Sequence, residues 1–196
     1  MAGVPVLVVV SGMGMSEAAI CASEVIRLFD PCGVIGFGTA GALSETWAIG
    51  KSALVSSAAA YQPPRLLPLP AQNPPRPTLS EARSDKEWLK VGQEQLHLPA
   101  VKVGSANEPV TNAFLARHLA TVYGFDWVDC ESHSVLDVAA RHGVRAAGFR
   151  TVSDHCGPET TEPFEDNARR ALRDAARWLE KFVGALYEAQ LLGPRT

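Results

Sequence analysis

The stretch that decides the fold is VRAAGFRTVSDHC, residues 144–156, together with FDWVDCESH, residues 125–133. Each begins as an apolar, strand-like run and ends in acidic residues, with Glu131 in one and Asp154 in the other. In an α/β sheet, polar residues at the carboxyl ends of apolar strands line the ligand crevice. We therefore expect Glu131 and Asp154 to face the same cleft from two strands.

The bulk composition indicates an ordinary globular domain. The chain has 196 residues, of which 46% are hydrophobic and 20% charged, and this length can bury a sizeable core. A net charge of −3 favours neither nucleic acid nor an anionic membrane as a partner. The longest apolar run, residues 4–10, is too short to span a bilayer and lacks the flanks of a secretory signal.

The cysteines and histidines do not indicate a metal site. The four cysteines have no CxxC spacing, which argues against a zinc knuckle and a disulfide framework. Grouping His133, His155 and Cys156 around a metal is improbable, because no two of them are at ligand spacing on one helix. Reduced thiols are the default in a cytoplasmic protein. We therefore expect a cytoplasmic protein that needs neither a metal nor an organic cofactor.

Strands and helices alternate along the chain. The Val- and Leu-rich run 4–10 predicts a buried strand, and Ser16 is a suitable N-cap for a helix over 17–29. A strand over 33–37 then completes a βαβ unit with parallel pairing. Further strands are predicted over 52–61, 99–103, 125–128 and 144–152, and further helices over 80–95, 110–122, 132–142 and 162–192. This alternation predicts a three-layer α/β/α fold, with residues 1–196 forming one domain.

A proline-rich segment interrupts the alternation. Residues 62–78 contain seven prolines, and each proline removes an amide donor and restricts φ. The segment is therefore expected to be a loop or a polyproline stretch. A solvated surface loop is the more ordinary interpretation, and a lid or a subunit contact is the alternative.

Several site candidates have two interpretations when taken singly. The glycine-rich run GFGTAGAL, residues 36–43, follows a strand and offers the Thr39 hydroxyl, yet glycine at a strand end often serves only a turn. It is not a GxGxxG run that opens a helix, which disfavours a dinucleotide fold. Glu131 could bind vicinal hydroxyls, or it could be a charge favoured at a helix N-terminus. Asp154 could likewise be a turn residue.

Taken together, these strings resemble the purine nucleoside phosphorylase and nucleosidase superfamily. VIGFGTAGAL (34–43), followed by WAIGK (47–51), looks like its strand–glycine loop and turn. DCES (129–132) is similar to its E-M-E segment, and FRTVSD (149–154) to its V-R-x-I-S-D segment. The order and spacing fit from about 6 to 186. The resemblance implies a central mixed, mostly parallel sheet and assembly as dimers or higher oligomers.

The resemblance also implies a role for each matching residue. Glu131 would bind the ribose 2′- and 3′-hydroxyls, and Asp154 would be the general acid that protonates the purine leaving group at N7. Burial and the nearby charge of Glu131 should raise the pKa of Asp154 enough for that role. The other substrate-binding positions are Cys130 beside the ribose, Thr39, Ala40 and Gly41 near the nucleophile, Ser153, and Pro109 and Val110 over the base, where an aromatic side chain is absent.

Two differences between this sequence and the superfamily's usual motifs bear on whether water or phosphate is the nucleophile. Phosphorylases of the family commonly carry a phosphate-binding arginine where this chain has Gly36, so hydrolysis is favoured. The earlier strand with a water-activating G-A-M-x-x-E glutamate is not found, so either another carboxylate such as Glu108 takes that role or the nucleophile site is incomplete and activity is weak or absent. We therefore expect hydrolysis of an adenosine-like nucleoside, with a phosphorylase or a nucleoside-binding protein as alternatives. Residues 128–133 and 107–110 look most like the short hopanoid-associated branch.

Overall fold

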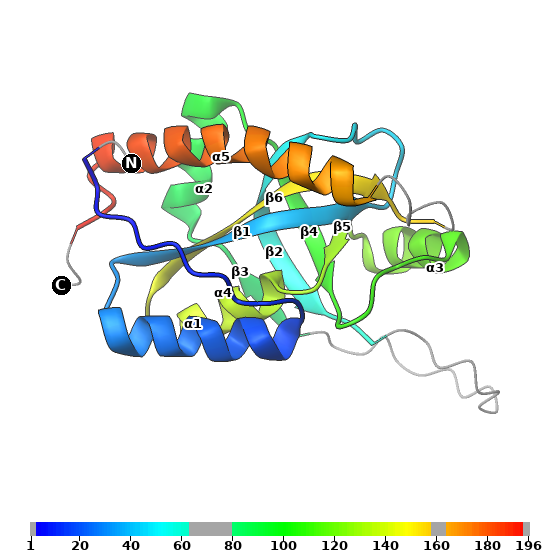
Figure 1. Ribbon diagram of the computed structural model, residues 1–196, viewed down its shortest axis with the longest axis horizontal. Helices are drawn as coiled ribbons and strands as arrows, with labels where there is room; N and C mark the ends of the chain where they lie inside the picture. Colours follow the sequence, from blue (N-terminus) through cyan, green and yellow to red (C-terminus); the bar gives the residue numbers. More distant parts are fainter. Residues whose placement is uncertain (1–2, 63–79, 158–163, 194–196) are drawn as a thin grey trace.

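The structure is a computed structural model that describes residues 3–62, 80–157 and 164–193. Strands and helices alternate through most of these residues, which confirms the expected α/β class (Figure 1). In chain order the elements are α1 (Met15–Phe29), β1 (Gly33–Ala42), β2 (Ser52–Ala60), β3 (Glu81–Arg83), α2 (Lys86–Leu96), β4 (Ala100–Ser105), α3 (Ala113–His118), η1 (Leu119–Tyr123), β5 (Trp127–Asp129), α4 (Ser132–Arg141), β6 (Arg145–His155) and α5 (Phe164–Glu188).

The strands form one mixed sheet that closes on itself. Its order is β3-β2-β4-β5-β1-β6, and β2 also pairs with β6. The β1–β6, β2–β4 and β4–β5 pairs are parallel, whereas the β1–β5, β2–β3 and β2–β6 pairs are antiparallel. At the β2–β6 seam, Val55 lies opposite Gly148. There the hydroxyls of Ser52 and Thr151 form a buried hydrogen bond of 2.8 Å.

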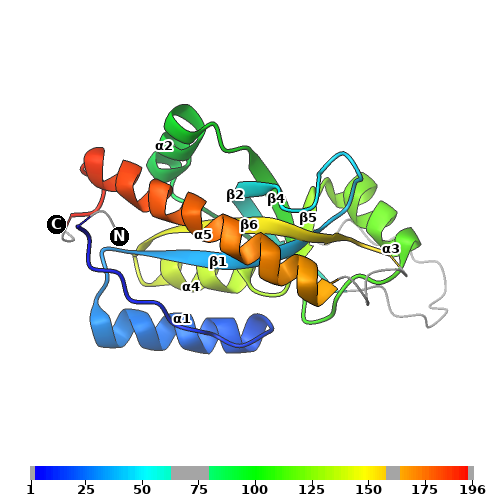
Figure 2. The same ribbon diagram turned by 45° about the horizontal axis from the view of Figure 1, so that its top comes forward.

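Helices cover both faces of the sheet, as expected for three layers (Figures 1 and 2). On one face, Leu136 of α4 packs with Val55 and Trp127 of the sheet, and α1 lies outside α4. On the other face, Trp88 of α2 and Phe182 of α5 pack edge to face above the sheet, with ring centroids 6.5 Å apart. Burial of these apolar faces is the main source of stability in such a layered fold.

The predicted helix over 80–95 is two elements in the structure. Its first residues form strand β3, which pairs antiparallel with the second half of β2. The helix begins only after Asp85, whose carboxylate accepts hydrogen bonds from the backbone amides of Glu87 and Trp88 at 3.0 Å. An aspartate that caps in this way is a strong start signal, and it fixes where α2 begins.

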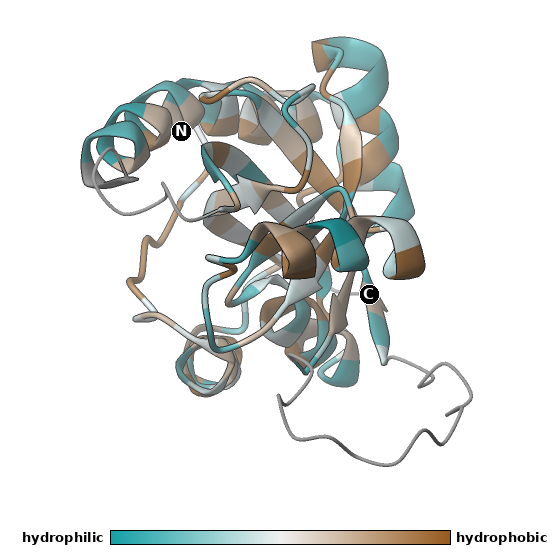
Figure 3. Ribbon diagram, turned by 90° about the vertical axis from the view of Figure 1, so that its right-hand side faces the viewer, coloured by the Kyte–Doolittle hydropathy of each residue, from teal (hydrophilic) through white to brown (hydrophobic). Residues whose placement is uncertain are grey.

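The prediction of a buried strand over residues 4–10 is wrong. This segment is extended but belongs to no strand, and its side chains are open to solvent, with Val8 77% and Val10 91% exposed. Figure 3 colours it toward the hydrophobic end of the scale. An apolar, β-branched run shows that a segment suits a sheet, but only a neighbouring edge can make it a strand. Helix α1 then begins at Met15, with Gly14 rather than Ser16 as its N-cap.

The proline-rich loop predicted over 62–78 lies outside the described residues, apart from Gln62. The closing amphipathic helix predicted over 162–192 is present as α5. None of the described helices is long and apolar enough to cross a bilayer.

Candidate active site

Three strand ends bring the two acids to the same end of the sheet. Gly41, near the end of β1, pairs with Val128 of β5 on one side and with Asp154 of β6 on the other. The Cα atoms of Val128 and Asp154 are thus two strand spacings apart, about 10 Å. Glu131 follows β5 directly, before α4. The expectation that both acids lie at one sheet edge therefore agrees with the topology.

Asp154 is half-buried beside the backbone of β1. Its Oδ2 accepts a hydrogen bond of 2.7 Å from the Ser153 hydroxyl, and a Cβ atom built on Gly41 would lie 3.2 Å from its Oδ1. Burial raises the pKa of Asp154 above its usual range, although the Ser153 hydrogen bond and the nearby His155 oppose the shift. Loss of hydration penalises the ionised carboxylate more than the neutral acid. The site thus favours the proton-carrying form of Asp154.

Glu131 has the stronger set of partners. Its Oε1 accepts a hydrogen bond of 3.1 Å from the backbone amide of Gly14, at the start of α1. Its Oε2 lies 3.8 Å from Nη2 of Arg150. Burial raises the pKa of Glu131, but the Arg150 charge and the Gly14 amide lower it. Glu131 is therefore half-buried and oriented by two donors, as a carboxylate that binds a ligand needs to be.

Arg150 and Asp129 form a buried ion pair below the two acids. The Arg150 Nε lies 2.6 Å from the Asp129 Oδ2, and the side chains are only 2% and 1% exposed. The Arg150 Nη1 also donates to the Gly36 carbonyl at 2.8 Å. Asp129 in addition accepts from the Ser105 hydroxyl at 2.6 Å and from the backbone amide of Ser132 at 3.2 Å. This network ties β4, β5, β6 and the start of α4 together.

The ion pair bears on the expectation that no guanidinium is present at the position of Gly36. Gly36 supplies no guanidinium of its own, but the structure brings Arg150 of β6 against the carbonyl of that residue. A Cβ atom on Gly38 would lie 3.3 Å from Nη1 of Arg150, so the glycines of β1 leave room for this side chain. Two of its nitrogen atoms are already bound to Asp129 and Gly36. Only Nη2 points toward Glu131.

The structure distributes the remaining predicted site residues over this end of the sheet. Thr39 is partly exposed on β1, where it pairs with Thr151, and Ala40 next to it is buried. The Ser153 hydroxyl is buried and within reach of Asp154. Cys130 is half-buried, and burial raises the pKa of its thiol to about 11. Of the pair expected over the base, Val110 is buried but Pro109 is exposed.

Sequence reasoning missed two groups near the acids. Asn107 accepts a hydrogen bond of 2.8 Å from the backbone amide of Met15, which ties the loop after β4 to the start of α1. Tyr61 is buried in an apolar cluster with Val110 and Phe125. The pKa of Tyr61 is raised by burial and then by the nearby Cys156 and Cys130. These groups are distant in sequence, and a motif search has no means of joining them.

His133 and His155 each take part in a hydrogen bond near the two acids. His133 is buried at the start of α4, where its backbone amide donates to the Ser105 hydroxyl at 3.1 Å. The Nε2 of His155 donates to the carbonyl of Trp47 at 2.8 Å. Cys156 lies close to Asp154, because its sulfur is 2.6 Å from the Cβ position of Gly41.

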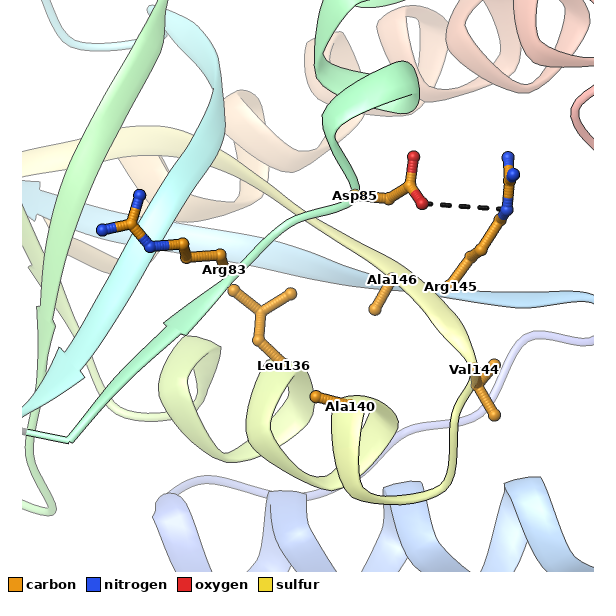
Figure 4. Close-up of a pocket in the computed structure, with 7 residues that line it drawn as sticks. All are labelled: Arg83, Asp85, Leu136, Ala140, Val144, Arg145 and Ala146. Carbon is orange, nitrogen blue, oxygen red and sulfur yellow. Dashed lines mark ion pairs between the residues drawn. The ribbon is translucent and has the colours of Figure 1, made fainter.

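A separate pocket of about 190 Å³ lies away from the two acids (Figure 4). It is lined by residues of β3, α4 and the start of β6. Arg145 of this lining is nine residues before Asp154 on β6, or about 30 Å along an extended strand. Its guanidinium is paired with Asp85 at 3.7 Å and with Glu87 at 2.9 Å. This pocket therefore belongs to the opposite end of the sheet.

The comparisons with known proteins identify the class. The family model of the phosphorylase superfamily matches residues 1–184, so the chain belongs to that superfamily. A search of curated proteins found no match.

Solved structures resemble the chain in fold at low sequence identity. Futalosine hydrolase of Helicobacter pylori is 17% identical, with a TM-score of 0.77 over 88% of this chain and 76% of its own. The 5′-methylthioadenosine/S-adenosylhomocysteine nucleosidase of Neisseria meningitidis, in complex with methylthio-immucillin-A, is 18% identical, with a TM-score of 0.77 over 90% and 80%. The S-adenosylhomocysteine nucleosidase of Streptococcus pyogenes is 17% identical, with a TM-score of 0.76 over 90% and 77%.

Proposed function

We propose that this protein is a nucleosidase that hydrolyses the N-glycosidic bond of a purine, adenosine-like nucleoside and releases the base. One observation carries the proposal: Glu131 and Asp154, both half-buried, lie at one end of the sheet on either side of β1. Family membership and the nucleoside analogue in the Neisseria meningitidis structure support the substrate class.

Asp154 would serve as the general acid. When an N-glycosidic bond breaks, positive charge develops on the ribose and negative charge on the departing base. A protonated carboxyl at the base neutralises that charge, and such an acid typically contributes about 10²–10⁴-fold to the rate. Burial, which raises the pKa of Asp154, keeps the proton available. Ser153 holds the orientation of the carboxyl through its hydrogen bond.

Glu131 would bind the ribose hydroxyls with its carboxylate. The Gly14 amide and Arg150 already hold the two oxygens in place, so little side-chain entropy would be lost on binding. Cys130, Thr39, Ala40 and Gly41 would line the sugar side. Pro109 and Val110 would cover the base.

Water is the favoured nucleophile. A phosphate would need a guanidinium free for bidentate contact, whereas Arg150 is 2% exposed and paired with Asp129. The Nη2 atom that remains near Glu131 suits a single water molecule better than a dianion. Glu108, exposed on the loop after β4, is the candidate for activating that water.

The decisive experiment measures adenine release from adenosine-like nucleosides with different 5′-substituents, in buffers with and without phosphate. We expect release at the same rate in both. Release that requires phosphate would identify a phosphorylase, and binding of the nucleoside without release would identify a binding protein. Including an adenosyl lipid among the substrates tests the similarity to the hopanoid-associated branch.

Three broader assignments accompany the activity. We propose a cytoplasmic location, because all four cysteines are unpaired thiols and thiols stay reduced in that compartment. We propose that residues 1–196 form one domain around the closed sheet. We also propose that the protein is a homodimer.

A further inference from the structure

Tyr61 is a buried residue whose hydroxyl has no hydrogen-bond partner among the described residues. It follows the last residue of β2, and its backbone amide donates to the Ser105 carbonyl at 3.0 Å. Its ring lies beside that of Phe125, with centroids 6.2 Å apart. The ring also fits against Gly104, where an added Cβ atom would lie 3.1 Å from it. These contacts hold the ring in place and so fix where the hydroxyl points.

The Tyr61 hydroxyl is accessible rather than sealed in the apolar cluster. A buried tyrosine hydroxyl normally finds a hydrogen-bond partner. In the described part of the chain, the fully enclosed side-chain polar atoms without a partner are Nε1 of Trp88 and of Trp127, Oγ of Ser132 and Nε2 of His133. The Tyr61 hydroxyl is not one of them, so the 5% of this residue that is exposed includes its oxygen. A bound ligand can therefore reach it.

The surroundings of this hydroxyl are those of the two acids. Burial raises the pKa of Tyr61 above its usual range, and the nearby thiols of Cys156 and Cys130 raise it further. Cys130 comes directly before Glu131, and Cys156 comes two residues after Asp154. The hydroxyl thus lies near residues that flank both acids. Because its pKa is raised, it keeps its proton through the neutral range and remains a hydrogen-bond donor.

Within the proposed site, Tyr61 lies on the side of the base. It shares an apolar cluster with Val110, and Cys156 packs against that cluster. Under the proposed function, Val110 covers the base and Asp154, close to Cys156, protonates it. The thiol of Cys156 acts on Tyr61 more strongly than that of Cys130, which would lie beside the ribose. The group that the hydroxyl meets is therefore expected on the purine.

We propose that the Tyr61 hydroxyl donates a hydrogen bond to N1 or N3 of the purine and stabilises the base as it departs. The inference rests on the proposed nucleosidase function and adds a second donor beside Asp154. Negative charge grows on the base as the N-glycosidic bond breaks. A fixed donor therefore binds the base more strongly in the transition state than in the ground state. Tyr61 should contribute to kcat as well as to affinity.

The variant Tyr61→Phe removes the hydroxyl and leaves the ring. Isothermal titration calorimetry with adenine should give a Kd about 3–10-fold weaker than that of the wild type, as expected for one neutral hydrogen bond. In adenine release from an adenosine-like nucleoside, kcat/KM should fall about 10–100-fold and kcat should fall too, because hydrogen bonds to charged groups are stronger. The melting temperature should not fall, since no protein group loses a partner.

The matched control is Tyr187→Phe, the same chemical change at a 54% exposed position on α5. Its neighbour Leu186 shares an apolar cluster with Ala147, near the start of β6, and so lies away from the two acids. This variant should match the wild type in adenine affinity, turnover and melting temperature.

Two analogues of adenine identify the nitrogen that accepts the bond. In 1-deazaadenine and 3-deazaadenine a carbon replaces N1 or N3, and the analogue without the acceptor should bind the wild type and Tyr61→Phe equally. The proposal is overturned by equal adenine affinity of the two proteins, by weaker binding of both analogues to the variant, or by a lower melting temperature of the variant.

The same measurements separate this inference from the nucleosidase proposal. A wild type that releases adenine no faster than Tyr61→Phe does would refute only the role of Tyr61. A wild type that binds adenine more tightly than the variant yet releases none from any nucleoside would refute only the hydrolysis. A wild type that neither binds nor releases adenine would refute both.

Discussion

Asp154 and Asp137 show that the surroundings of an aspartate decide which chemical role is expected of it. Asp137 is partly exposed on α4 and paired with Arg141 at 2.7 Å, and no chemistry is expected of it. Asp154 is half-buried at a strand end, and burial raises its pKa. The two therefore provide a matched pair for substitution.

Replacing Asp154 by Asn should lower the rate of adenine release by about 10²–10⁴-fold, because the amide cannot donate the acid proton. The control Asp137→Asn should release adenine at the wild-type rate. Steady-state kinetics with an adenosine-like nucleoside measures both. Wild-type turnover by the Asp154 variant would remove that residue from the mechanism.

The pH dependence of kcat/KM should be bell-shaped. On the alkaline side activity falls as pH rises through the raised pKa of Asp154, because the acid loses its proton. On the acid side it falls as Glu131 is protonated, also at a raised pKa, because a neutral carboxyl binds hydroxyls less strongly. A pH–rate profile of the wild type and of Glu131→Gln measures both limbs. A wild-type profile that stays flat through the neutral range into alkali would contradict the assignment of Asp154.

The same shift predicts an effect on stability. A carboxyl whose pKa is higher in the folded state than in the unfolded state binds its proton more tightly when folded, so its contribution is present at low pH and is lost as pH rises through the folded pKa. Asparagine at position 154 cannot ionise, so the Asp154→Asn variant does not lose this stability as pH rises. Its melting temperature relative to the wild type should therefore rise between a pH near the ordinary carboxyl pKa of about 4 and pH 8.

At the scale of elements, the ion pair between Asp129 and Arg150 connects β5 to β6. Both side chains are almost fully buried. Asp129→Ala would leave the guanidinium buried without its partner, and such a loss costs about 3–5 kcal/mol. Urea denaturation should show this decrease in the free energy of unfolding. The comparison is Asp137→Ala, which breaks an exposed pair worth at most about 1 kcal/mol; equal losses in the two variants would show that the buried pair has no special role.

For the whole molecule, closure of the sheet depends on the close approach of β2 and β6. A Cβ atom on Gly148 would lie 2.7 Å from the Cβ of Val55, and in a strand this contact can be relieved only by moving backbone. Gly148→Ala should therefore destabilise the protein by about 1–3 kcal/mol, measured by urea denaturation. At Gly157 the nearest atom is 3.9 Å away, so Gly157→Ala should be nearly neutral.

Local patterns in the sequence determined most of the elements and the order of the motifs. The runs that became β2, β4 and β6, the helix over 132–142 and the strand ends at Glu131 and Asp154 were all readable, because apolar periodicity and breaker residues act over a few neighbours. The family resemblance follows from the same short strings. The assignment of roles to Glu131 and Asp154 stays a prediction until activity is measured.

Only the tertiary structure decided what depends on distant partners. Residues 4–10 have the composition of a buried strand but belong to no strand in the described part of the chain, and β3 exists because β2 offers an edge to residues 81–83. Arg150 reaches Gly36 across the sheet, and the Gly14 amide reaches Glu131 from a position 117 residues away. Periodicity records which residues prefer burial, whereas pairing and side-chain contacts require two segments to meet, and that depends on the path of the whole chain.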